Sequence, residues 1–231
     1  MSSALVVTTE GVVVAKFNPA HVPAGSSAGG QFAHGSAGGG IASLSVEPKV
    51  SKWVETGVRD SINRFDPDLL GSQKVTVELH AGQGEVRTST NGYEFHEGGH
   101  WDAAQSTVRI FGCDKPTAAA WAQGAVEHEL GHAVFDRLSK VSSTLQTTPE
   151  GKKIATTAYK PLIQLAKANY KHGGVSDYSR AWKGSPTEEF AEMMKFKTHY
   201  PKKYEALHAD VRASFEKCLD AAKTLTKLGV A

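Results

Sequence analysis

The segment Glu127-His128-Glu129-Leu130-Gly131-His132 (EHELGH) decides the interpretation of this chain. Residues four apart on an α-helix lie on one face, so the imidazoles of His128 and His132 can reach one ion. Glu129 projects beside that ion, where it can take a proton from an attacking water. Neutral imidazoles with a carboxylate and one open position suit zinc. The segment therefore predicts a catalytic Zn²⁺ site with His128 and His132 as metal ligands and Glu129 as general base.

The alternative is a chance match on a polar helix face, and the surrounding sequence disfavours it. The motif lies within residues 117–139, a stretch whose composition and spacing predict one long helix. Gly131 costs about 1 kcal/mol relative to Ala in a helix interior, so we expect a packing reason for it. Apolar neighbours indicate that both histidines are partly buried, where they need hydrogen-bond partners or a ligand.

A catalytic zinc site needs a third protein ligand. No third histidine follows His132 in the H-x-x-G-x-x-H pattern, so that ligand set is absent. A downstream helix offers glutamates instead: Glu188 and Glu192 share one face, whereas Glu189 points about 100° away. Glu188 has a second possible role, because Ser185-Pro186-Thr187-Glu188 matches a capping box in which the glutamate folds back onto Ser185.

The rest of the chain predicts an α+β domain, with few strands early and helices late. Alternating polar and apolar residues predict strands at 74–80 and 107–111, with a shorter extended piece at 85–88. Helical spacing predicts helices at 50–65, 117–139, 152–171 (bent or broken near Pro161), 186–199 and 203–228. We therefore expect a small mixed sheet, the motif-bearing helix and a C-terminal helical part.

Length and composition predict one domain preceded by a tail. Residues 1–48 are expected to form a flexible arm, since the Gly/Ala/Ser-rich stretch at 19–40 cannot bury enough apolar surface to order itself. Val6–Val7 and Val12–Ala15 allow a small hairpin within it. Residues 49–231 are expected to form the folded domain.

Charge and cysteine content exclude several classes of protein. The chain carries 26 Lys and Arg against 24 Asp and Glu, a balance that argues against nucleic acid as a partner. No apolar run of about 18 residues occurs and the first residues lack a secretory pattern, so neither a membrane span nor export is expected. Cys113 and Cys218 are expected as buried free thiols in a cytoplasm, although one bridge between them stays open.

The blocks HELGHAVFD (128–136) and SDYSRAWKGSPTEEFAEMM (176–194) resemble the gluzincin peptidases, in particular the anthrax lethal factor catalytic-domain family. The resemblance covers roughly residues 101–197 and implies a zincin-like metallopeptidase domain that acts on a protein or peptide. It implies that Glu188 is the third zinc ligand, Glu192 supports a ligand, and Tyr178 assists the transition state. The spacing from Tyr178 to Glu188 is longer than in the family, so Tyr170 stays open as an alternative.

Other residues near the motif carry weaker predictions. Gly98–Asp102, followed by 107–111, resembles the strand before the active-site helix of zincins, whose edge would pair with an extended substrate. His96 and His100 either line that cleft or are exposed loop residues. Asp136 either orients a ligand or is an exposed helix charge. Both Trp101 and Trp121 are expected in the core.

Residues 17–33 (FNPAHVPAGSSAGGQFA) are similar to a short motif of tailed-phage and prophage proteins. The similarity implies a phage-encoded peptidase, in the host cytoplasm or attached to a virion or phage head; a plain linker is the alternative. The leading function is a zinc-dependent endopeptidase. Its rivals are a non-catalytic phage structural or docking protein with a degenerate zincin fold, and a toxin-like peptidase that cuts one host protein.

Overall fold

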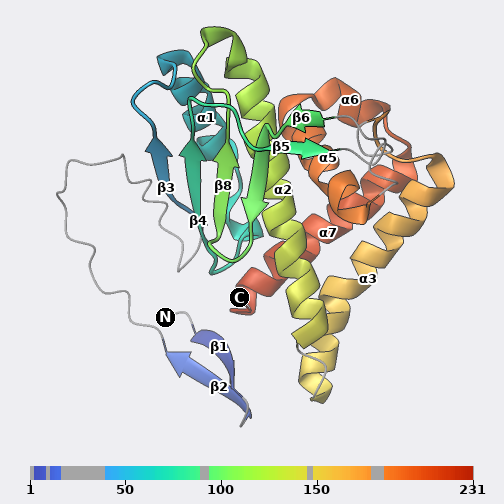
Figure 1. Cartoon of the computed structure of the whole chain (residues 1–231). Coiled ribbons are helices and arrows are strands. Elements are labelled where there is room, and N and C mark those ends of the chain that lie inside the picture. Colours follow the sequence, from blue (N-terminus) through green and yellow to red (C-terminus); the bar gives the residue numbers. More distant parts are fainter. Residues whose placement is uncertain are drawn as a thin grey trace.

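The computed structural model describes residues 3–8, 11–16, 40–88, 94–144, 148–177 and 185–230, arranged as a mixed α+β fold (Figure 1). The strands are β1 (Ser3–Thr8), β2 (Gly11–Lys16), β3 (Gly40–Val46), β4 (Lys74–Leu79), β5 (Val86–Thr88), β6 (Glu94–His96), β7 (Gly99–Asp102) and β8 (Thr107–Ile110). The helices are α1 (Lys52–Arg64), α2 (Ala119–Thr144), α3 (Pro149–His172), α5 (Pro186–His199), α6 (Pro201–Ala206) and α7 (Ala209–Lys227), with short 3₁₀ helices at Pro67–Leu69 and Pro116–Ala118.

The main sheet has four strands in the order β3-β4-β8-β7. β3, β4 and β8 run parallel, whereas β7 pairs antiparallel with β8 and forms one edge. Strand β4 alternates buried Val75, Val77 and Leu79 with partly exposed Thr76 and Glu78, as a sheet with one covered face requires. Helices α1 and α2 lie side by side against the covered face (Figure 1).

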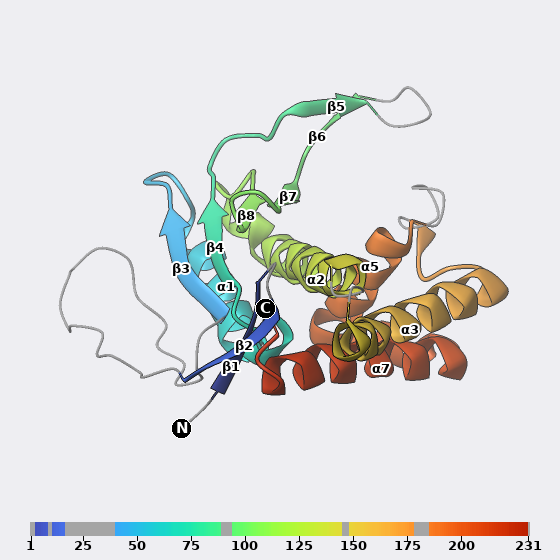
Figure 2. The same ribbon diagram turned by 90° about the horizontal axis from the view of Figure 1, so that it is seen from below.

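A second strand pair forms the rim of the sheet. β5 and β6 pair antiparallel, and β6 leads directly into the edge strand β7. Seen from below, this pair stands clear of the other strands, on the side of α2 that faces away from α7 (Figure 2). This pair and α2 contribute residues to the same cleft, in which the candidate site lies.

The helical part packs against α2. Gly131 lies where α5 crosses, and a Cβ at this glycine would come within 2.8 Å of Ala191 Cα. The expected packing reason for Gly131 is thus confirmed. On α5, Phe190 is fully buried and its ring centroid lies 5.0 Å from that of Phe215 on α7. This close approach of α2 and α5 brings the two sequence motifs together.

The coarse α+β prediction is confirmed, and three details differ from the sequence interpretation. Composition predicts an arm over residues 1–48, but Gly40–Val46 forms strand β3. Its Ile41 and Leu44 are buried and its backbone pairs with β4, which offsets the ordering cost of a Gly- and Ser-containing segment. The suggested hairpin in the arm is present as β1 and β2, while residues 17–39 lie outside the described residues.

The other two differences concern where the C-terminal helices are interrupted. The single helix expected over 203–228 is divided into α6 and α7, because His208 takes an extended backbone conformation and its Nδ1 accepts the N–H of Asp210 as a cap. Pro161 lies inside a helix that continues from Pro149 to His172, so of the two expected effects, a bend or a break, the break is absent.

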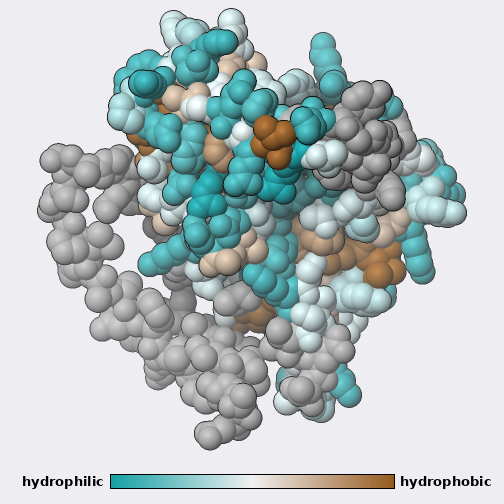
Figure 3. Space-filling view, in the orientation of Figure 1, coloured by the Kyte–Doolittle hydropathy of each residue, from teal (hydrophilic) through white to brown (hydrophobic). Residues whose placement is uncertain are grey.

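The surface carries both hydrophilic and hydrophobic regions, and the two cysteines of the described residues are buried. The face in Figure 3 is largely hydrophilic over the sheet, with hydrophobic residues gathered over the helical part. Within the described ranges, no helix combines the length and apolar content needed to span a bilayer. Cys113 and Cys218 are both buried and free, and burial raises the pKa of each thiol to about 12.

Candidate metal centre

The side chains of His128, His132 and Glu188 converge at the crossing of α2 and α5. The Nε2 atoms of the two histidines lie 3.1 Å apart. Glu188 faces both rings: its Oε2 is 3.2 Å from His128 Nε2 and its Oε1 is 3.5 Å from His132 Nε2. The histidines are a helical turn apart on α2, and Glu188 comes from the first turn of α5. The structure thus brings together all three residues predicted as ligands.

The spacing of these atoms fits a tetrahedral ion. Ligand atoms at about 2.0–2.1 Å from a tetrahedral zinc are separated from one another by about 3.3–3.4 Å. The two histidine nitrogens lie 3.1 Å apart, and each has one oxygen of the Glu188 carboxylate, Oε2 for His128 and Oε1 for His132, at 3.2 and 3.5 Å, values close to this separation. The two imidazole planes meet at 85°, so one point can lie in both ring planes, where the nitrogen lone pairs point. The donor set and its geometry therefore fit a small divalent cation.

Glu188 does not act as a helix cap. Ser185 is the residue before α5, and its side chain makes no cap hydrogen bond. The Glu188 carboxylate turns toward α2 instead, and its Oε2 is a buried oxygen for which the described residues supply no regular hydrogen bond. A buried carboxylate oxygen in this state is costly unless a cation or a proton satisfies it.

Glu192 contacts the Nδ1 side of the His128 ring, opposite the Nε2 atom that faces Glu188. Its Oε1 lies 3.1 Å from His128 Nδ1 and also accepts a hydrogen bond from Lys195 Nζ. Glu192 is buried, one turn after Glu188 on the same face of α5. An Nδ1–H bond to this carboxylate leaves the Nε2 lone pair of His128 directed at Glu188 and His132, as a ligand histidine requires.

The carboxylates make the cluster favourable for positive charge. Burial opposes protonation of His128, but Glu188 and Glu192 outweigh it and raise the pKa of this histidine to about 9. Burial, and then the neighbouring His128, lower the pKa of His132 to about 4. Burial also disfavours ionisation of Glu192, yet its bonds to His128 and Lys195 lower its pKa to about 2. A cation between the rings and Glu188 is therefore stabilised by ionised carboxylates on two sides.

Glu129 lies between the histidines and the edge strand. Burial, together with the charges of Glu188 and Glu97, raises the pKa of Glu129 to about 7 against the opposing effect of His128. The backbone N–H of Trp101 on β7 donates a hydrogen bond to its carboxylate. A Cβ at Gly99 would lie 3.4 Å from Glu129 Oε1, so the strand passes close to the carboxylate. A pKa near neutrality suits a general base.

A cleft of about 1110 Å³ contains the whole cluster. The β5–β6–β7 rim forms one wall, and α2 with the start of α5 forms the other. Both His96 and His100 line it, and His100 is no exposed loop residue: its Nδ1 lies 3.0 Å from Glu97 and its Nε2 lies 3.3 Å from Arg109 Nη1.

Two tryptophans line the same cleft. Trp101 is partly buried and packs against the core, whereas Trp121 is 44% exposed. The prediction of Trp121 as a core residue is therefore wrong. A signal for its true position is present in the sequence, because Trp121, His128 and His132 recur on one helix face, seven and four residues apart.

The other residues with predicted roles, Asp136, Tyr178 and Tyr170, do not join the cluster of His128, His132 and Glu188 within the described residues. Asp136 lines the cleft, but its carboxylate pairs with Lys140 one turn further along α2 at 2.8 Å. Tyr178 lies outside the described residues. Its alternative, Tyr170, is 92% exposed on α3 and is not among the residues that line the cleft. Tyr200, at the end of α5, does line the cleft, and the sequence interpretation did not consider it.

A second group of potential ligands is less suited to one ion. His172, His208 and Asp210 cluster near the end of α3 and the start of α7. The rings of His172 and His208 stack with centroids 3.5 Å apart and planes at 13°. An ion bound by imidazole nitrogen lies in the plane of the ring, and nearly parallel planes share no such point. The geometry therefore favours the cluster on α2 and α5.

Comparison with known proteins adds no relative: no family model, no curated protein and no solved structure matches this chain. The assignment of a role to the cluster therefore depends on its own geometry and chemistry.

Proposed function

We propose that the chain is a zinc-dependent endopeptidase of the gluzincin type, with a zincin-like domain. The observation that carries the proposal is the convergence of His128, His132 and Glu188 at separations suited to a tetrahedral ion. Glu129, adjacent to the first ligand and buried with a pKa raised to about 7, supplies the base that such an enzyme needs. The likeness to the lethal factor catalytic-domain family agrees with this role.

Each residue of the cluster has a distinct task in peptide hydrolysis. His128, His132 and Glu188 would hold the zinc, which when bound polarises a carbonyl oxygen and lowers the pKa of water. Glu129 accepts a proton from the attacking water and delivers it to the leaving amine. The Trp101 N–H keeps the Glu129 carboxylate beside the sheet, and Glu192 fixes the orientation of His128.

The cleft is shaped for an extended peptide. β7 is the outer strand of the four-stranded sheet, so its backbone groups on the cleft side are available to a peptide that adds as a further strand. The same strand donates to Glu129 through Trp101. A peptide paired with β7 would therefore run past the general base and across the histidines, which is the placement that hydrolysis of an internal bond requires.

Zinc analysis of purified, reconstituted protein tests the metal assignment. Wild type is expected to bind one equivalent, and His128→Ala or His132→Ala is expected to lose it. His172→Ala is the matched control, since it removes a histidine of the second cluster and is expected to retain the zinc. Full zinc binding by both α2 variants, with loss in the control, would contradict the proposal.

Cleavage of a peptide library tests the enzyme assignment. Glu129→Gln is expected to keep its zinc and to lower kcat by about 10²- to 10⁴-fold, because the general base is removed. Wild-type protein that binds zinc at the α2 histidines yet cleaves no peptide or protein would favour the non-catalytic docking protein. Cleavage of a single protein from a host lysate, with no cleavage of short peptides, would favour the toxin-like peptidase.

A further inference from the structure

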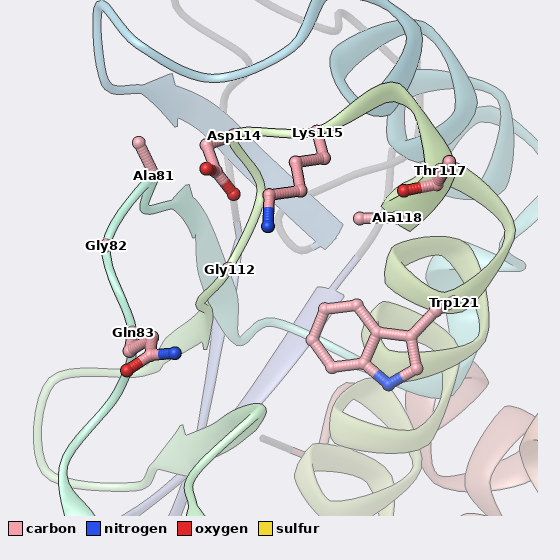
Figure 4. Close-up of a pocket in the computed structure, with 9 residues that line it drawn as sticks. All are labelled: Ala81, Gly82, Gln83, Gly112, Asp114, Lys115, Thr117, Ala118 and Trp121. Atoms are coloured by element: carbon pink, nitrogen blue, oxygen red, sulfur yellow. The ribbon is translucent and has the colours of Figure 1, made fainter.

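A second cavity opens beside the cleft and shares a wall with it. It has a volume of about 450 Å³ and lies between the loops that follow β4 and β8 and the start of α2 (Figure 4). Thr117 and Trp121 line both this cavity and the cleft that contains the histidines. A peptide lying in the cleft can therefore place a side chain in the second cavity without leaving the protein surface.

Trp121 lies between the cleft and the second cavity and lines both. The indole is 44% exposed, a high value for the largest side chain on the helix that carries the site. A Cβ at Gly98 would lie 2.6 Å from Trp121 Cζ2, so the ring packs against the backbone directly before β7. This contact fixes the ring beside the strand that a substrate would follow.

The distance between Trp121 and His128 along α2 indicates how many peptide residues separate the second cavity from the bond at the histidines. Trp121 precedes His128 by seven residues, which corresponds to about 10 Å at 1.5 Å per residue. An extended peptide advances about 3.3 Å per residue. A side chain in the second cavity therefore belongs to a residue about three positions from the bond that lies at the histidines.

The cavity offers an aromatic face, two side chains of opposite charge, and the neutral polar side chains of Gln83 and Thr117. In Figure 4 the Lys115 amine and the Asp114 carboxylate point into the same space, and the Trp121 ring lies below them. The opposite wall is formed by Gly82 and Gly112, where Gly112 N–H donates to Gly82 O at 2.7 Å, and by the side chain of Gln83 (Figure 4). The adjacent charges of Asp114 and Lys115 compensate each other, which favours a guest without net charge.

A phenol meets all of these conditions. Its ring can stack on the exposed indole. Its hydroxyl can donate to the Asp114 carboxylate and accept from the Lys115 amine, which matches the one donor and the acceptor lone pairs of the group. We propose that the second cavity binds a tyrosine side chain of the peptide substrate, about three residues from the scissile bond. The inference rests on the proposed endopeptidase function and narrows its substrate.

Fluorine NMR on the full chain tests the proposal. The Glu129→Gln protein, loaded with zinc and labelled with fluorotryptophan, is titrated with glycine–alanine hexapeptides that carry a single Tyr, Phe, Glu or Lys. The Trp121 resonance is the one missing from Trp121→Phe. The Tyr peptide is expected to shift this resonance saturably, with a Kd about 3- to 10-fold lower than that of the Phe peptide, as expected for a hydroxyl that gains hydrogen bonds.

Two variants test separately the polar groups of the cavity and the space that the ring would occupy. Asp114→Asn with Lys115→Met is expected to remove the preference for Tyr over Phe while leaving the Kd of the Phe peptide unchanged. Ala118→Leu, at a side chain that points into the cavity in Figure 4, is expected to weaken binding of both peptides. Equal Kd values for all four peptides, or an unmoved Trp121 resonance while another tryptophan responds, would overturn the inference.

Cleavage by wild type distinguishes failure of the inference from failure of the proposed function. Efficient cleavage of peptides regardless of a tyrosine near the cut bond means that the cavity assignment is wrong and the enzyme assignment stands. Tyrosine-selective shifts of Trp121, with no cleavage by wild type, mean that the cavity assignment is right and the peptidase assignment is wrong.

Discussion

At the scale of single residues, the candidate site depends on how one histidine is held. His128 faces Glu188 through Nε2 and Glu192 through Nδ1, so in the proposed site one carboxylate would complete the ligand set and the other would set the orientation of the ring. The two glutamates are a turn apart on α5 and differ in exposure, with Glu188 21% and Glu192 3% exposed. Both glutamates line the cleft, and the more accessible carboxylate is the one that lies beside the Nε2 atoms of both histidines.

Loss of the charge on Glu192 tests this division of roles. Glu192→Gln is expected to raise the Kd for zinc by about 10- to 100-fold, because a weaker acceptor then holds the Nδ1–H of His128. The measurement is competition with a chelator of known affinity. Glu189→Gln, on the neighbouring α5 residue turned away from the histidines, is the control and is expected to leave the Kd within a factor of about two. An unchanged Kd for Glu192→Gln would remove this residue from the site.

Sequence reasoning reaches the ligand residues because their roles follow from local periodicity. The spacing alone places His128 and His132 on one helix face. For Glu188 the sequence allows two roles, metal ligand or helix cap, and only the crossing of α2 and α5 distinguishes them. The prediction for Trp121 is wrong because a large apolar residue on a helix is expected in the core by default. Its actual exposure depends on the position of the β5–β6–β7 rim, which the sequence does not give. The surroundings of Glu97, His100 and Arg109 involve three-dimensional contacts that no spacing rule gives.

At the scale of elements, two glycines on α2 offer a matched comparison. Gly131→Ala places a methyl group 2.8 Å from Ala191 Cα and 3.0 Å from Met194 Cβ, so α5 must shift. The expected net effect is a loss of about 1–3 kcal/mol in the free energy of unfolding. Gly124→Ala makes only ordinary contacts, the nearest 3.5 Å away on Lys195, and is expected to gain up to about 1 kcal/mol from helix propensity.

Chemical denaturation of the two variants checks this pair. Loss of zinc affinity is expected to accompany the destabilisation in Gly131→Ala, because Glu188 moves with α5. A Gly131→Ala protein as stable as Gly124→Ala would mean that the helices tolerate a wider separation than the structure indicates.

The contact between α5 and α7 predicts a pH effect on stability. Partial burial opposes ionisation of Glu216, but hydrogen bonds from Lys197 and Tyr204 outweigh it and lower its pKa below the ordinary 4.5. A lowered pKa stabilises the folded state above pH 4.5, and this contribution is lost as the pH falls through the folded-state value. Because the pair is partly exposed, we expect at most about 1 kcal/mol.

Urea denaturation between pH 7 and pH 3 measures the contribution. Glu216→Gln is expected to be less stable than wild type at pH 7 and to approach it at pH 3, since the variant has no carboxylate to titrate. A constant difference between the two proteins across this range would assign the effect to packing instead.

Elements were predictable where the signal is local. The periodicity of 117–139 and 186–199 predicts α2 and α5 closely, and the alternation in 74–80 predicts β4. β3 was missed because its stabilisation comes from parallel pairing with β4, a partner about 30 residues away that composition does not reveal. The break between α6 and α7 depends on one histidine cap, and apolar residues continue in the same stripe across it.

At the scale of the whole molecule, one buried arginine ties distant segments together. Arg137 on α2 donates to Leu69 O and Ala222 O at 3.1 Å and to Val230 O at 2.7 Å. Burial lowers its pKa to about 10, so it stays charged at neutral pH. The side chain passes over Gly71, whose φ is +62° and whose Cβ position would lie 2.4 Å from Arg137 Cζ.

Removal of this side chain is expected to weaken the entire fold. Arg137→Leu leaves three carbonyl groups without their donor and should lower the free energy of unfolding by about 2–4 kcal/mol, measured by urea denaturation. Arg59→Leu, which removes a partly exposed ion pair with Glu55 on one helix, is the control and should cost less than about 1 kcal/mol. Similar losses in both variants would show that the three hydrogen bonds of Arg137 stabilise the fold no more than a partly exposed ion pair does.

The proposed ligand residues lie on two helices that are separated in the chain by all of α3. An ion held by His128, His132 and Glu188 would therefore act as a cross-link between α2 and α5. Free zinc at a hundred times its Kd would add about 2.7 kcal/mol to the native state, and a chelator would remove the same amount. The melting temperature of this protein would then depend on the zinc concentration around it, so the zinc that the proposed activity needs would also set the lifetime of the folded chain.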